Sequence, residues 1–156
     1  MRLVVAALFV LVSTTPSRAQ DTTSRDRAME TVQTFIRANE TANLELIVGT
    51  FDEAATVFFP GGQAQRANGT GEIREGFAGL FTQRTGAITI TPRDVHIQMF
   101  GDLAIVTAHL SDLPTAPVRE PTTFSRRTFV LRPVGDRWLI VHLHASNYLL
   151  PATKNR

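Results

Sequence analysis

Cysteine is absent from this chain of 156 residues. Thiol nucleophiles, iron–sulfur clusters and cysteine-ligated zinc are therefore excluded, and no disulfide can stabilise the fold. Lysine is almost absent as well, because Lys154 is the only one and the other basic residues are arginines. No stretch of basic residues reaches the length of a polybasic patch, so the composition argues against nucleic acid as a partner.

No apolar run in the sequence is long enough to span a membrane, which takes about 20 residues. The longest run covers residues 3–12, follows the basic Arg2 and precedes a small-x-small cleavage pattern that ends at Ala19. This arrangement is typical of a secretory signal peptide. We expect residues 1–19 to be removed and residues 20–156 to form one secreted or periplasmic domain, with no membrane contact after cleavage.

The charge of the chain becomes balanced once this signal peptide is removed. The full sequence has 16 basic and 14 acidic residues, and Arg2 and Arg18 would leave with the signal peptide. The net charge of +2 therefore gives no support for a polyanionic partner or a membrane surface.

Helical spacing of apolar residues is confined to the first half of the expected mature domain. It predicts a first helix that ends near Glu40 and a shorter helix or turn over residues 44–51. A third helix is expected between Thr70, its predicted cap, and a stop at Gly86. The remaining segments are typical of strands, and they cover residues 54–59, 88–100, 103–110, 122–134 and 137–148.

This order of elements predicts an α+β fold, in which about three N-terminal helices pack on one face of a curved sheet. Pro92 within the segment 88–100 predicts an edge strand or a bulge there. The segment 122–134 is apolar on both of its faces, although the helices can cover only one. The second face is therefore expected to meet a partner subunit in a two-fold homodimer.

The last strand carries the most informative pattern in the chain. Period-two alternation places one set of its residues on a plain core face, namely Leu139, Val141, Leu143 and Ala145. The same alternation predicts a second face that is apolar at first and then polar, formed by Trp138, Ile140, His142, His144 and Ser146. A strand of this kind can form both the wall and the floor of a binding pocket.

Several motifs in this order resemble one known superfamily. They are Phe58-Phe59-Pro60-Gly61-Gly62, a helix start at Gly69-x-Gly71-Glu72-Ile73, and a final hairpin with Arg126-Arg127-Thr128-Phe129-Val130 and Gly135-x-x-Trp138-x-Ile140-Val141-His142-x-His144-x-Ser146. The sequence resembles the nuclear transport factor 2-like superfamily in its SnoaL-like branch. The last hairpin is also similar to the association domain of calcium/calmodulin-dependent kinase II.

The resemblance implies a cone: a strongly curved, mixed or antiparallel sheet wrapped around helices, with a ligand pocket at the open end. It also implies that Arg126 points into this pocket and pairs with an acid or an anionic ligand. Periodicity places Arg127 on the face of Phe129 and Leu131 and Arg126 on the opposite face, so it cannot by itself choose the pocket arginine. The choice between the two arginines stays open at the level of the sequence.

The candidate catalytic residues are His144, which could move a proton, and Arg126, which could hold an anion or enolate charge. Residues expected to contact a small-molecule ligand are His142, Ser146, His109, Trp138 and Phe59. The His142–His144 pair lacks an evident third ligand in the sequence, so we predict neither a metal nor another cofactor.

Two functions follow from these observations. The first is an exported small-molecule-binding domain that acts, if it is an enzyme, as an isomerase, cyclase or dehydratase on an apolar carbonyl or carboxylate compound. Ketosteroid isomerase chemistry that depends on a tyrosine is disfavoured, because Tyr148 is the only tyrosine and lies far from the first helix. The alternative is a non-catalytic oligomerisation module like the kinase association domain.

Overall fold

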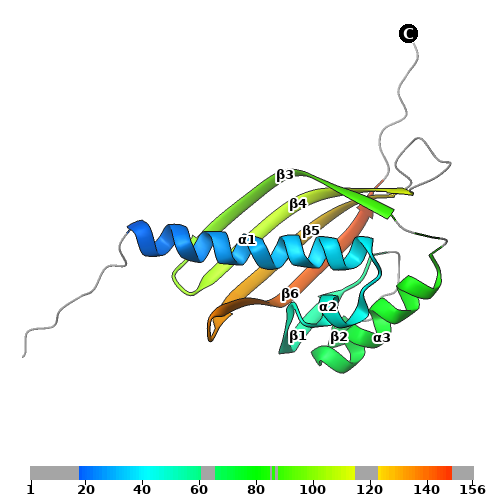
Figure 1. The fold of residues 1–156 in the computed structure, drawn as a ribbon, viewed down its shortest axis with the longest axis horizontal. Coiled ribbons are helices and arrows are strands. Elements are labelled where there is room, and N and C mark those ends of the chain that lie inside the picture. Colours follow the sequence, from blue (N-terminus) through cyan, green and yellow to red (C-terminus); the bar gives the residue numbers. More distant parts are fainter. Residues whose placement is uncertain (1–17, 61–65, 85, 87, 115–122, 149–156) are drawn as a thin grey trace, which may run out of the picture.

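The computed structural model describes residues 18–60, 66–84, 86, 88–114 and 123–148. Three helices occupy the first half of the chain: α1 (Arg18–Glu40), α2 (Leu44–Val48) and α3 (Gly69–Thr82). One curved, unclosed sheet contains the strands β1 (Phe51–Phe58), β2 (Arg66–Asn68), β3 (Ile88–Phe100), β4 (Leu103–Pro114), β5 (Thr123–Val134) and β6 (Arg137–Tyr148). The α+β fold class predicted from the sequence is confirmed, and Figure 1 shows α1 lying across the sheet.

The strands of the sheet follow the order β2-β1-β6-β5-β4-β3. All neighbours are antiparallel except β1 and β6, which run parallel in the interior of the sheet. The short strand β2 was not expected, because three residues are too few to show alternation. The second helix also ends earlier than predicted, at Val48, and β1 begins at Phe51.

Strand β3 confirms the prediction made from Pro92. It lies at one edge of the sheet, where a residue without an N–H group is tolerated. Its register with β4 also shifts between Arg93 and His96, and Asp94 takes a φ of 51° there.

A β-bulge interrupts the alternation of β6. Val130 of β5 pairs with His142, whereas the next residue, Leu131, pairs with Ile140, so Val141 is the extra residue. The two sides of the strand therefore exchange at Val141.

The residues of β6 that face the helices come from both predicted sets, because of this bulge. Trp138 and Ile140 before it, and Leu143 and Ala145 after it, are all at most 5% exposed. The expectation that Trp138 and Ile140 share a face with the two histidines and Ser146 is wrong. A strict period of two cannot reveal a single inserted residue.

An aromatic cluster joins the helices to the sheet. Phe35 of α1 is fully buried and meets three other rings edge to face or nearly so. The ring centroids are 6.0 Å away for Phe51, 5.8 Å for Phe77 and 5.2 Å for Phe129. These partners lie on β1, α3 and β5, so one side chain connects four elements.

Most of the expected signal peptide lies outside the described residues, which begin at Arg18. Arg18 and Ala19 occupy the first turn of α1. Cleavage after Ala19 and export therefore stay predictions. Within the described ranges, no helix combines the length and apolar character needed to cross a membrane.

Replacing Phe35 by alanine is expected to lower the free energy of unfolding by about 3–5 kcal/mol, because it leaves a cavity among four elements. Urea unfolding followed by circular dichroism measures this change. Leu46→Ala is the control, since Leu46 is 42% exposed on α2 and should cost less than about 1 kcal/mol. Similar losses for both variants would contradict the central position of Phe35.

Candidate functional site

A cavity of about 220 Å³ lies between α3, the end of α1 and the side of the sheet that the helices cover. We refer to it as the inner cavity. Its apolar wall is formed by Val57, Phe59, Pro60, Phe77, Leu80 and Leu143. The rings of Phe59 and Phe77 meet edge to face with centroids 5.0 Å apart, so this wall is largely aromatic.

The rest of the lining of the inner cavity is polar and carries formal charges. It consists of Asn39, Gln83, Arg84, Asp112, Arg127 and Asn147. Two guanidinium groups face one carboxyl group, so the lining is positive whether Asp112 is ionised or not. A small apolar molecule with an anionic group matches this combination of walls.

Arg127 reaches the inner cavity because of its position on β5. In the strand register it lies opposite Ala108 of β4 and Ala145 of β6. Both alanines are 4% exposed, so Arg127 lies on the buried side of the sheet. The two small side chains leave room for the guanidinium group between them. Burial lowers the pKa of Arg127 to about 10. The charge of Asp112 acts against this shift and the charge of Arg84 adds to it. The guanidinium group therefore stays charged at neutral pH.

The Nε of Arg127 is buried and has no hydrogen-bond partner among the described residues. A buried N–H of a charged group that lacks a partner is costly, so such groups are normally paired. The Nε is closed off from the cavity as well as from solvent, whereas the two terminal nitrogens of the Arg127 guanidinium group are not, so an acceptor within the cavity would bond to these terminal nitrogens.

Asp112 is the acidic group of the inner cavity. It follows Ala104, Val106, Ala108 and Leu110 on the buried side of β4, each at most 4% exposed. Burial raises its pKa, although the positive charges of Arg127 and Arg84 act against this shift. No described residue makes an ion pair within 4.0 Å of Asp112. A carboxyl group with a raised pKa and no fixed partner is able to exchange a proton.

Arg84, just beyond α3, holds the end of α1 against the inner cavity. Its guanidinium group donates to both the main-chain oxygen and the side-chain oxygen of Asn39. It also lies over the ring of Phe81, 4.9 Å from the centroid. Burial lowers the pKa of Arg84, and Asp112 acts against this shift. Arg84 thus adds positive charge while being fixed in place.

Arg126 lies on the opposite side of the sheet, which we refer to as the outer face. It is exposed, and in the strand register it lies opposite His109 of β4 and Ser146 of β6. The Cζ of its guanidinium group lies over the Tyr148 ring, 4.9 Å from the centroid. The orientation that the family resemblance implied for Arg126 is therefore wrong, and Arg127 is the arginine that lines the inner cavity. Neighbouring residues of a strand must point to opposite sides, so only one of them can reach the inner cavity.

His142 and His144 also lie on the outer face. The Oγ1 of Thr56 and the Nδ1 of His142 are 2.7 Å apart, and the Phe58 ring lies within 5.9 Å of both imidazoles, centroid to centroid. Burial, followed by the charges of His144 and Arg66, lowers the pKa of His142. Neither histidine lines the inner cavity, so the sheet separates them from Asp112 and Arg127.

Ser146 and His109 join this outer group. Ser146 lies opposite Arg126 in the strand register. His109 lies beside Tyr148, with ring centroids 5.7 Å apart. A second cleft, of about 230 Å³, has His109, Phe124 and Tyr148 in its lining. The structure thus brings five of the expected site residues together, on the face away from the inner cavity: Arg126, His142, His144, Ser146 and His109.

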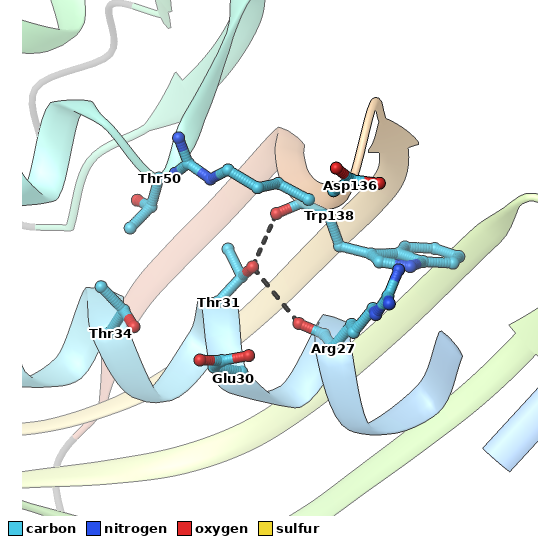
Figure 2. Close-up of a pocket in the computed structure, with 8 residues that line it drawn as sticks. Arg27, Glu30, Thr31, Thr34, Thr50, Asp136 and Trp138 are labelled. Carbon is cyan, nitrogen blue, oxygen red and sulfur yellow. Dashed lines mark hydrogen bonds between the residues drawn. The ribbon is translucent and has the colours of Figure 1, made fainter. Parts of the chain in front are cut away.

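The two remaining expected residues lie elsewhere. Phe59 is part of the wall of the inner cavity. Trp138 is 5% exposed and borders a separate cleft beside α1, which Figure 2 shows. Thr31 of α1 donates to the Trp138 carbonyl at 2.6 Å. This bond fixes the start of β6 against α1.

No three or more His, Cys, Asp or Glu side chains gather as a metal site would require, within the part of the chain that the structure describes. Asp52 of β1, which is 7% exposed, forms a salt bridge with Arg132 of β5, and its Oδ2 lies 2.8 Å from the Nη2 of Arg132. This bond, with a second from the Ala54 N–H, lowers the pKa of Asp52.

Asp112 and Arg84 were not singled out in the sequence. The alternation of buried residues from Ala104 to Leu110 predicts the correct side for Asp112 when it is continued by one step. The sequence contains no comparable signal for Arg84, because its place depends on how α3 ends against α1.

Comparison with known proteins agrees with this architecture. A family model described as a SnoaL-like domain matches residues 28–151. No curated protein matches the chain.

Several solved structures share the fold. A candidate dehydratase of the nuclear transport factor 2-like family from Streptomyces avermitilis is 23% identical, with a TM-score of 0.71, and covers 83% of this chain and 99% of its own. A candidate calcium/calmodulin-dependent kinase II association domain from Thiobacillus denitrificans is 20% identical, with a TM-score of 0.69, and covers 78% and 94%. A candidate ketosteroid isomerase from Shewanella frigidimarina is 22% identical, with a TM-score of 0.64, and covers 79% and 97%.

Asp112→Asn is expected to be more stable than the wild type at about pH 7 and equally stable near pH 3. The folded state binds the Asp112 proton more tightly than the unfolded chain does, since the folded pKa lies above 3.8. As the pH rises from about 3 to 7, Asp112 of the wild type ionises and the free energy of unfolding falls. Asparagine cannot ionise, so the variant does not lose stability in this way. Urea unfolding at both pH values measures the difference. Asp26→Asn, at an exposed site on α1, is the control. If Asp112→Asn were less stable than the wild type at neutral pH, the raised pKa of Asp112 would be refuted.

Proposed function

Because the chain belongs to the SnoaL-like domain family, we propose that it is an exported protein that binds a small apolar molecule in the inner cavity. The ligand carries a carboxylate or a carbonyl group. Its apolar part lies against the aromatic wall of Phe59 and Phe77. Its polar end lies at Arg127, with Arg84 and Asp112 nearby on the same lining.

One observation carries this proposal: the Arg127 guanidinium group lines the inner cavity and forms no ion pair within 4.0 Å with any residue that the structure describes. A carboxylate or enolate oxygen accepts charge-assisted hydrogen bonds from a guanidinium group, and such bonds are stronger than neutral ones. The family resemblance implied an arginine in this role, and the role passes from Arg126 to its neighbour because only Arg127 lines the inner cavity.

Any turnover in this site is acid–base chemistry of the isomerase or lyase type. Asp112 takes a proton from the carbon beside a carbonyl, and Arg127 stabilises the negative charge that develops on the oxygen. Return of the proton at another carbon completes an isomerisation, and loss of a hydroxide equivalent as water completes a dehydration. The fold shared with a candidate dehydratase and a candidate ketosteroid isomerase is consistent with this class.

The outer face supports a second function, association with another copy of the chain. It exposes large apolar side chains that no described element covers: Phe58 is 38% exposed, Phe100 56%, Leu103 41% and Val134 41%. The likeness to a candidate kinase association domain favours the same role. We propose a two-fold homodimer through this face, which leaves an inner cavity in each subunit.

Arg127→Met is expected to abolish the thermal stabilisation that carboxylate ligands give the wild type, because it removes the guanidinium donor and keeps the bulk of the side chain. Arg126→Met is the matched control, since it makes the same change one residue away on the outer face and should leave the stabilisation intact. The measurement is a melting-temperature scan with a set of carboxylates and carbonyl compounds. A loss for Arg126→Met and none for Arg127→Met would overturn the proposed site.

Val130→Arg is expected to convert the dimer to a monomer, because it places a charge beside Ile105 and His142 on the outer face. Gln33→Arg adds the same group at an exposed position of α1 and should leave the mass unchanged. Light scattering after size-exclusion chromatography measures both masses. If the wild type is monomeric at micromolar concentration, the proposal of a homodimer is refuted, whereas the proposal of ligand binding is not affected.

A further inference from the structure

Gly76 lies within α3, where its missing side chain makes room for the Phe59 ring. A Cβ built on Gly76 would lie 2.4 Å from both Cε2 and Cζ of Phe59, closer than real side chains approach. Glycine is a poor helix former, so a glycine inside a helix calls for a packing reason. Gly79 in the same helix has nothing within 4 Å of such a Cβ, so the contact is particular to Gly76.

The Phe59 ring held by Gly76 is also a wall of the inner cavity. Its edge-to-face contact with Phe77 fixes it from a second side. A methyl group at position 76 would force the Phe59 ring, which is one wall of the inner cavity, to shift. The volume available to a ligand therefore depends on this pair of residues.

The inner cavity is partly open to solvent, and its volume indicates how much of a ligand it can enclose. A dry apolar cavity of about 150 Å³ accommodates a benzene molecule. The 220 Å³ of the inner cavity therefore matches one six-membered ring together with a carboxylate-sized group. The edge-to-face rings of Phe59 and Phe77 offer a wall on which an aromatic ring packs well.

We infer that the inner cavity is built for a carboxylate borne on a single aromatic ring, and that Gly76 sets this size limit by seating Phe59. The carboxylate occupies the Arg127 end, where the guanidinium group forms no ion pair with any described residue. The ring occupies the Phe59 and Phe77 end. The inference rests on the proposed binding of a carboxylate in this cavity, and it adds the size and shape of the ligand.

The experiment is isothermal titration of the full chain with benzoate, hexanoate, 2-naphthoate and benzamide. Benzoate should bind the wild type most tightly, and benzamide about 10-fold or more weakly, because it lacks the charge. Gly76→Ala should weaken benzoate binding about 10-fold by crowding the site. Gly79→Ala is the matched control and should bind like the wild type.

A double variant separates crowding from loss of folding. Gly76→Ala with Phe59→Leu removes the ring that collides with the new methyl group, so benzoate binding should recover, whereas a misfolded Gly76→Ala protein would not be rescued. Phe59→Leu alone should gain affinity for 2-naphthoate. Equal affinity of the wild type for hexanoate, benzoate and 2-naphthoate, all of them lost in Arg127→Met, would overturn the size limit while the proposed function stands. Binding of none of the carboxylates would overturn the proposed function itself.

Discussion

The packing of Phe35 against three other rings is the interaction on which the rest of the structure depends. It holds α1, α3, β1 and β5 in one arrangement, and no disulfide assists it, since the chain lacks cysteine. Phe77 belongs both to this cluster and to the wall of the inner cavity. The core and the site therefore share a side chain, and the shape of the cavity is as fixed as the packing around Phe35.

The polar side of the inner cavity works against the stability that this cluster provides. Arg127 has a buried donor without a described partner, and the pKa shifts of Arg127, Arg84 and Asp112 all have burial as their largest cause. A sequence selected for stability alone would place apolar residues there, as it does at Ala108 and Ala145 on either side of Arg127. Such a conflict is typical of a site that a ligand completes.

Sequence periodicity predicted the sheet and helices well, because long alternating strands and one apolar helix stripe dominate the chain. It also placed Arg127 on the same face of β5 as Phe129 and Leu131, which the structure shows to be the buried side, whereas the family resemblance had favoured Arg126 as the pocket residue. It failed at β6, because one extra residue at Val141 reverses the sides of the strand and moves His142 and His144 to the outer face. A bulge depends on the pairing with β5, which a single strand pattern does not contain.

The candidate site was harder to predict, because its parts come from six segments of the chain. Asp112 and Arg127 lie on strands whose alternation was readable, but Arg84 and Asn39 meet only because α3 ends against α1. Phe59 could be named from the end of β1, whereas the role of Gly76 requires the packing of α3 on that strand.

The parallel pairing of β1 with β6 has a consequence for the order of folding. Phe58 lies beside His144 in the sheet, although the strands β2, β3, β4 and β5 lie between them in the chain. The β1 segment cannot take its place in the sheet until the last strand has been made, and such distant contacts form slowly. A chain that leaves the ribosome amino end first thus completes this sheet only after β6 has been made.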